Sequence, residues 1–217
     1  MPAVHLCRPR NKVKAMMTDR STMATTRPPP ITVLSTVVAL FLLLCTTSSL
    51  AAGAQPPLID ASCAATPHPD LCKSRLMACP DSKDASTPRA LAEVAIRAAS
   101  DVGSAAGGYA REQLDVVKDN VLWQCLDECA DDIEEAVSHL DDTEGEIDDA
   151  RFNDVKLFLD TAERDSWSCD ESCRFAPQTP VKAAILAKNK DFETIMAVTH
   201  ALIQQATGGG TAPSSAP

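Results

Sequence analysis

Along most of the chain, apolar residues recur at steps of three and four, the spacing of helices that bury one face. No stretch alternates apolar and polar residues convincingly with period two, so the sequence predicts helices rather than a sheet. Four stretches are long enough for bundle helices, approximately at 88–103, 109–140, 153–173 and 180–206. The short links between them favour an all-α, antiparallel up-down four-helix bundle.

Cap and turn residues mark the ends of these helices. Thr87-Pro88 and Thr179-Pro180 each combine a hydroxyl N-cap with proline at the first helical position, so each is expected to start a helix. Gly103 and the Gly107-Gly108 pair are expected to weaken or end the first helix. The acidic segment 141–149 is expected to be a solvated loop between the second and third helices.

Two cysteine couplets, Cys125-x3-Cys129 and Cys169-x3-Cys173, lie on the apolar stripes of the second and third helices. Residues four apart share one helix face, one turn above each other. In an antiparallel pair of helices, Cys125 meets Cys173 and Cys129 meets Cys169 in a single register. The spacing therefore predicts a disulfide ladder with two rungs between these helices.

The segment before the bundle holds Cys63 and Cys72, with Pro67 and Pro69 between them. The prolines interrupt any continuous helix, so a short helical hairpin pinned by a Cys63–Cys72 disulfide fits best. Cys79 is then left over. We expect it to be a free thiol in a monomer, with a dimer through Cys79 as the alternative.

The N-terminal region has the layout of a secretory signal peptide. An apolar run at 31–45 follows six basic residues and one acid, and Ala52-Gly53-Ala54 supplies a small-x-small cleavage pattern before Gln55. A retained membrane anchor is the alternative, although the run is short for a span of ~20 residues. Met23 would give the signal a more usual length, which would make residues 1–22 a gene-model extension or a second targeting signal.

These features divide the chain into an extension and signal peptide at 1–54, a folded domain at 55–206 and a flexible tail at 207–217. Cleavage would leave 14 Lys and Arg against 29 Asp and Glu, out of 20 and 30 in the whole chain. Such an acidic protein is a poor binder of the nucleic-acid backbone. Its charge suits a basic protein partner, or merely solubility.

Catalytic chemistry is not indicated. His68, His139 and His200 occur in no nucleophile or metal motif, so we predict no catalytic residue, no metal, no cofactor and no enzyme activity. Reduced Cys-x3-Cys couplets could bind zinc or occur in mitochondrial twin-cysteine hairpins. The apolar targeting segment and the long stretch between the couplets oppose both alternatives.

The chain resembles the plant invertase and pectin methylesterase inhibitor family over nearly all of 56–206. The motif Ile59-x3-Cys63-x2-Thr66-x5-Cys72-x3-Leu76 is similar to the opening motif of that family. Further matches are Cys129 with Ala136 and Val137, and Leu159-x2-Ala162 before Cys169, whereas Ile133 stands where the family usually has tyrosine. The resemblance implies a hairpin followed by a four-helix bundle, with disulfides Cys63–Cys72 and Cys129–Cys169. Cys125 and Cys173 are additions to that pattern.

The resemblance also implies an inhibitory contact. Invertase inhibitors carry Pro-Lys-Phe between the helices with the third and fourth cysteines, where this chain has Ala150-Arg151-Phe152. Arg151 could pair with the active-site carboxylates of a glycosidase, beside Phe152 as an aromatic plug. The alternative is that both residues merely begin the third helix, with Phe152 packed inward. Exposed carboxylates on the second and third helices could instead meet a basic esterase.

We therefore predict a secreted, non-catalytic protein that inhibits a plant pectin methylesterase or an acid invertase by forming a stoichiometric complex. The expected location is the apoplast or cell wall, or the vacuole, with no nucleic-acid partner and no membrane association after signal cleavage. The alternative function is a structural or ligand-binding helical bundle of the secretory pathway. Such a ligand-binding bundle would need a large internal cavity, whereas an inhibitor needs a packed bundle with an external contact surface.

Overall fold

The computed structural model describes Cys7 and residues 55–208. The predicted signal segment apart from Cys7, and the predicted tail beyond Gly208, lie outside these residues. The described elements are α2 (Gln55–Ala64), α3 (Pro69–Ala78), the 3-10 helix η3 (Pro80–Lys83), α4 (Pro88–Leu114), α5 (Asn120–Asp148), α6 (Phe152–Ser166), α7 (Ser168–Ser172) and α8 (Pro180–Ala206). None of these helices is long and apolar enough to cross a membrane.

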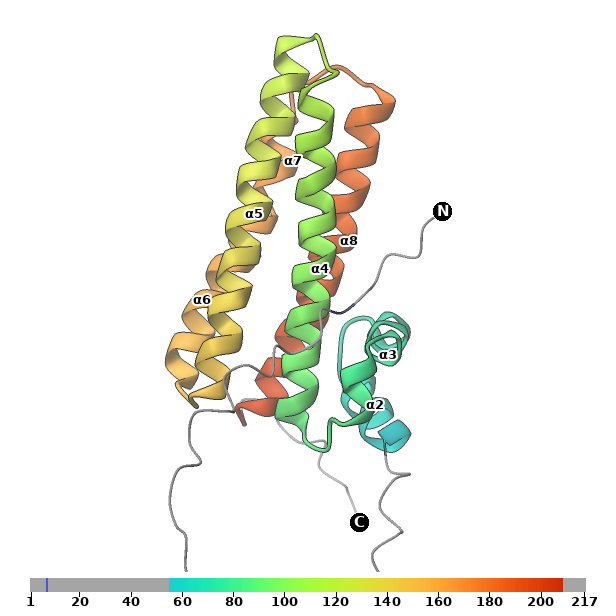
Figure 1. The fold of residues 1–217 in the computed structure, drawn as a ribbon, viewed down its shortest axis with the longest axis vertical. Coiled ribbons are helices and arrows are strands. Elements are labelled where there is room, and N and C mark those ends of the chain that lie inside the picture. Colours follow the sequence, from blue (N-terminus) through green and yellow to red (C-terminus); the bar gives the residue numbers. More distant parts are fainter. Residues whose placement is uncertain (1–6, 8–54, 209–217) are drawn as a thin grey trace, which may run out of the picture. The chain divides into compact units, whose positions relative to one another are not determined.

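The long helices form an antiparallel bundle, which confirms the predicted fold. The helix α4 packs along both α5 and α8, and α6 packs along the far side of α5 (Figure 1). Of the four contacts between neighbouring long helices, the one between α6 and α8 is the least extensive. The hairpin of α2 and α3 packs against α4 and α8 near one end of the bundle, where Ile59 and Leu76 are buried.

Side-chain caps begin three of the long helices. Thr87 Oγ1 accepts a hydrogen bond from the backbone N–H of Ala90, and Thr179 Oγ1 accepts one from Lys182, each at 3.1 Å. Both are starts that the sequence predicts. Asp119 caps α5 in the same way, accepting from the N–H of Leu122 at 2.8 Å. These bonds satisfy backbone donors that have no partner within the helix.

The first long helix does not end at its glycines. It continues as α4 to Leu114, and the second helix begins at Asn120 rather than near Tyr109. Gly103 is needed inside the helix, because a Cβ atom there would lie 2.6 Å from Val137 Cγ2. The glycine therefore marks a close approach between helices, not a helix end.

The acidic segment 141–149 is also helical for most of its length, contrary to the expected loop. The helix α5 runs through it to Asp148. Thr143 and Ile147 are fully buried, so they continue the inner stripe of α5 beyond Leu140. The chain turns only at Ala150, which has a left-handed φ of 59°.

The third predicted helix is divided into two. The helix α6 ends at Ser166 and the short α7 begins at Ser168, with the exposed Trp167 between them. Asn189 on α8 is buried beside this break and donates to the carbonyl of Ser166 at 2.9 Å. The break brings Cys169 and Cys173 of the α7 segment against α5, where both are fully buried.

Candidate functional site

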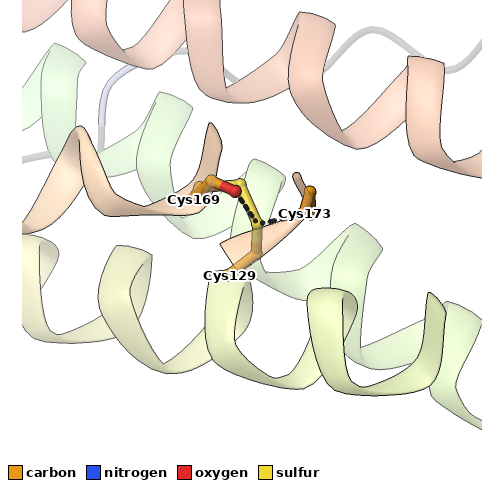
Figure 2. Close-up of side chains that lie close together, drawn as sticks. All are labelled: Cys129, Cys169 and Cys173. Carbon is orange, nitrogen blue, oxygen red and sulfur yellow. Dashed lines mark hydrogen bonds between the residues drawn. A yellow bond between two sulfur atoms is a disulfide. The ribbon is translucent and has the colours of Figure 1, made fainter. Parts of the chain in front are cut away.

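The ladder between α5 and the α7 segment has the pairing that the spacing predicts. Cys125 is bonded to Cys173 and Cys129 to Cys169, with Cα atoms 4.5 Å apart in each pair. Figure 2 shows the inner part of the ladder, where the Cys129 sulfur lies 3.4 Å from that of Cys173. Each sulfur is bonded to another sulfur, so these couplets offer no thiolate to a metal ion.

The hairpin is pinned by a Cys63–Cys72 disulfide, as expected. In the full chain Cys79 is bonded to Cys7. The expectation of an unpaired Cys79 concerned the chain without residues 1–54, so this bond does not test it. The backbone N–H of Cys7 donates to Asp101 Oδ2 of α4 at 2.5 Å, which also holds Cys7 against α4. Sequence analysis missed this bond because it assigned Cys7 to the segment removed with the signal.

The candidate contact residues Arg151 and Phe152 lie at the corner between α5 and α6. Arg151 is the N-cap residue of α6, and the left-handed Ala150 before it turns the chain out of α5. The Arg151 guanidinium forms two hydrogen bonds with the carboxylate of Glu146, and Asp149 lies 3.4 Å from it. Phe152 begins α6 and is 41% exposed, so it is not packed inward as the alternative interpretation would have it.

The ion pairs at this corner determine whether the Arg151 guanidinium is available to a binding partner. The hydrogen bonds with Arg151 lower the pKa of Glu146, and those with Glu146 raise the pKa of Arg151. Asp149 and Asp154 add two further carboxylates within 4 Å of the guanidinium. In the free protein the corner therefore carries more negative than positive charge. Arg151 would have to exchange Glu146 for a carboxylate of a partner.

A groove of about 330 Å³ lies beside Phe152, between α6 and α8. Phe152, Val155 and Leu159 line it from α6, and Ile203 lines it from α8. The groove lies where α6 and α8 contact each other less extensively than the other neighbouring long helices do. It places apolar side chains of two helices next to the exposed ring of Phe152. The sequence alone did not indicate this groove.

Carboxylates dominate the solvent face of α5. No lysine or arginine occurs between Val121 and Ala150. Glu128, Glu135 and Asp142 are exposed and recur every seven residues, which places them on one helix face. This face is an acidic surface that suits a basic partner.

Two arginines of α4 neutralise other carboxylates, and sequence analysis singled out neither of them. Arg111 pairs with Asp127, Asp131 and Glu134 of α5. Arg97 has a side chain only 10% exposed and pairs with Asp81 of η3 and Glu144 of α5. Each arginine is an isolated cation in a helical pattern, so only the fold reveals its partners.

One family model and two solved structures are similar to this chain. The model of the plant invertase/pectin methylesterase inhibitor family matches residues 57–202. A mutant form of a pectin methylesterase inhibitor from Arabidopsis superposes with a TM-score of 0.55 at 15% identity, over 65% of this chain and 92% of that chain. A second pectin methylesterase inhibitor, from Arabidopsis thaliana, superposes with a TM-score of 0.52 at 12% identity, over 70% of this chain and 97% of that one.

At such identities the two structures show a shared fold. No curated protein sequence matches the chain significantly. The match to the family model covers more than half of the chain and includes the hairpin and most of the bundle. The chain therefore belongs to the plant invertase/pectin methylesterase inhibitor family.

Proposed function

We propose that this protein is a secreted, non-catalytic inhibitor that blocks a pectin methylesterase or an acid invertase by stoichiometric occlusion. The observation that supports this most is a disulfide-locked bundle, of the inhibitor family's fold, with two external surfaces suited to contact. One is the acidic face of α5. The other is the corner formed by Arg151 and Phe152 beside the α6–α8 groove.

The acidic face favours a basic esterase as target. Glu128, Glu135 and Asp142 present their charges along one side of a rigid helix, with no cation of α5 between them. Complementary charge speeds encounter with a basic partner and disfavours acidic ones. The two solved structures named above are both of pectin methylesterase inhibitors, which agrees with this choice.

The Arg151–Phe152 corner is the surface that would serve an invertase. Phe152 offers an exposed aromatic ring, the type of side chain that anchors interfaces. The groove behind it is lined by apolar residues together with polar ones such as Lys156 and Gln204. Arg151 is already hydrogen-bonded to Glu146, so its contribution to binding would be the difference between two carboxylate partners. Phe152 is therefore expected to contribute more to inhibition than Arg151.

The test is a titration of the oxidised, secreted protein against a pectin methylesterase and an acid invertase, in separate assays at mildly acidic pH. Stoichiometric loss of one activity is expected. Inhibition of neither enzyme at micromolar excess would favour the structural or ligand-binding alternative. A linear titration that ends at one inhibitor per enzyme would distinguish occlusion from weak, non-specific effects.

Variants assign the contact surface. Phe152→Ala should weaken inhibition of an invertase more than Arg151→Ala does, with the helical circular dichroism unchanged. Glu128→Gln with Asp142→Asn should weaken inhibition of an esterase, and the effect should be larger at low salt. Asp191→Asn, an exposed carboxylate on α8, is the matched control for charge alone. Equal effects of the control and the α5 variants would argue against the acidic face.

Processing decides the state of Cys79. Cleavage before Gln55 would remove Cys7, the partner of Cys79 in the full chain. We propose that the secreted protein is then a monomer with a Cys79 thiol, with a Cys79-linked dimer as the other outcome. Mass spectrometry of the secreted material under non-reducing conditions would give the N-terminus, the thiol count and the mass of the species. A Cys7–Cys79 peptide in it would show that residues 1–54 are retained.

A further inference from the structure

The seam between α5 and α6 holds a group of ligand-type side chains, of which only Glu135 also belongs to the acidic face described above. Glu135 and His139 lie one turn apart on α5, and Asp165 of α6 reaches the same point. Asp165 Oδ2 lies 3.7 Å from His139 Nε2, and Glu135 Oε1 lies 3.9 Å from it. We propose that these three residues bind a divalent transition-metal ion, for which zinc is the best fit.

The donor set suits such an ion. One imidazole nitrogen and two carboxylates are common ligands of Zn²⁺, and they leave a fourth position for water at the exposed side of Glu135. Ligand atoms around a tetrahedral zinc ion are about 3.4 Å apart, given bonds of ~2.1 Å. The two separations from His139 Nε2 exceed this by a few tenths of an ångström, and all three ligand atoms lie within 4.8 Å of one another. A rotation of the exposed Glu135 side chain and a small adjustment of Asp165 would close the group around an ion.

The positions of His139 and Asp165 are fixed by their surroundings. The His139 ring stacks on Phe158 of α6, with ring centroids 6.0 Å apart and an interplanar angle of 23°. Asp165 lies one turn before Cys169, which is bonded to Cys129 of α5. The disulfide and the stacked ring hold two ligands on two helices at constant separation, as a pre-organised site requires.

One buried oxygen of the group, Asp165 Oδ2, has no hydrogen-bond partner and is shielded from solvent, and this points to a ligand. A buried carboxylate oxygen without a donor is costly, and a cation would satisfy it. A metal ion bound at this point would be such a cation.

A second group of the same composition lies between α6 and α8 and serves as a control. Asp160, Glu163 and His200 also have ligand atoms within 4.8 Å of one another. There, however, His200 Nδ1 is 3.1 Å from Glu163, and its Nε2 is 3.0 Å from Gln204. Both ring nitrogens are already engaged, so this group is not expected to take up zinc.

The test is calorimetric titration of ZnCl2 into the full-length, oxidised protein, freed of metal beforehand with a chelator. We expect one zinc ion per chain and a rise in the unfolding temperature on zinc addition. His139→Ala should weaken the association constant at least tenfold. Glu135→Gln should weaken it as well, and this substitution lies on the exposed face of α5, where it leaves the core untouched. His200→Ala should leave binding unchanged.

Either of two results would overturn the assignment. One is a protein that takes up no zinc at millimolar concentration. The other is a protein whose zinc binding is lost in His200→Ala and retained in both His139→Ala and Glu135→Gln. Circular dichroism of each variant shows whether the bundle has folded, so a loss of binding with intact helices is assigned to the ligand itself. The proposal is independent of which enzyme the protein inhibits.

Discussion

Gly103 of α4 lies directly against the ring of Phe192 of α8. A Cβ atom at Gly103 would come within 2.8 Å of the ring carbon Cε2, and within 2.6 Å of Val137 Cγ2 on α5. Phe192 is fully buried, so its ring has no free space into which to move. The three long helices meet at a glycine because no side chain fits there.

Gly103→Ala is therefore expected to destabilise the bundle by about 1–3 kcal/mol, the usual cost of overpacking a core. Gly108→Ala is the matched control, since a Cβ atom there meets nothing within 4 Å. Within the same helix that substitution should stabilise by about 0.5–1 kcal/mol, because alanine is the better helix former. Urea denaturation of the two variants measures both effects. A Gly103→Ala protein as stable as Gly108→Ala would contradict the packing described.

Gly103 also shows the limit of sequence analysis for this fold. A glycine in a helical pattern is consistent with a helix end or with a close contact between helices, and only the neighbours decide. The acidic segment 141–149 presents the same problem, because its burial depends on Thr143 and Ile147 facing the core. The cysteine couplets and the two Thr-Pro caps were predictable, since their chemistry requires a particular local geometry.

For the candidate site too, the sequence indicated some features and only the fold revealed the others. The Arg151–Phe152 pair was found through its resemblance to a family element. Its ion pair with Glu146 and its groove were not found, because they depend on the left-handed turn at Ala150 and on Ile203 from a distant helix. Pairings between residues far apart in sequence require the helix register, which hydrophobic spacing gives only to within a few residues.

The two rungs of the ladder should not contribute additively to stability. Cys125–Cys173 and Cys129–Cys169 close loops of 48 and 40 residues, each worth about 4 kcal/mol alone by the loop-entropy relation. Once one rung is present, the other closes only a small additional loop. Replacing one rung by two alanines should therefore cost clearly less than ~4 kcal/mol, and replacing both should cost more than the sum of the single losses.

Guanidinium denaturation of the two single-rung variants and of the variant without either rung gives the three values needed. A Cys63→Ala, Cys72→Ala variant controls for loss of a disulfide elsewhere, in the hairpin. If the stability lost in the variant without either rung equals the sum of the two single losses, the rungs constrain the unfolded chain independently. That result would contradict the nested pairing of the two disulfides.

Arg97 is expected to be the most important charged residue for stability. Its side chain is 10% exposed and donates to Glu144 Oε1 at 2.6 Å and to Asp81 Oδ2 at 3.3 Å, which links α5 and η3 to α4. Arg97→Ala removes a partner from carboxylates in a largely buried setting, and a loss of about 3 kcal/mol is expected. The exposed pair of Arg174 and Glu171 is the control.

Arg174→Ala should change the free energy of unfolding by less than about 1 kcal/mol, as is usual for surface ion pairs. Thermal unfolding followed by circular dichroism compares the two variants directly. Arg97→Met should recover part of the packing lost in Arg97→Ala while leaving the charge effect. Equal stabilities of Arg97→Ala and Arg174→Ala would show that the link to η3 and α5 contributes nothing.

Asp132 and Glu134 should affect stability with opposite dependence on pH. Burial raises the pKa of Asp132, and the charge of Glu128 acts in the same direction, against a hydrogen bond from Ser168. A group whose pKa is raised in the folded state contributes stability at pH values below its pKa in the unfolded chain, which is about 3.9 for aspartate. That contribution is lost as the pH rises through the pKa of the folded state. Asp132→Asn should therefore raise the unfolding temperature at pH 7 and have little effect below about pH 4.

Glu134 behaves in the opposite sense, because its hydrogen bonds with Arg111 lower its pKa. Its contribution is present above the unfolded value of about 4.3 and is lost as the pH falls through the folded pKa. Glu134→Gln should lower the unfolding temperature at pH 7 and have little effect in acid. Both side chains are partly exposed, so each change should stay within about 1 kcal/mol, or a few degrees. Unfolding curves from pH 3 to 8 give, for each substitution, the change in unfolding temperature as a function of pH. If the two changes have the same sign at pH 7, burial does not dominate for Asp132 or ion pairing does not dominate for Glu134.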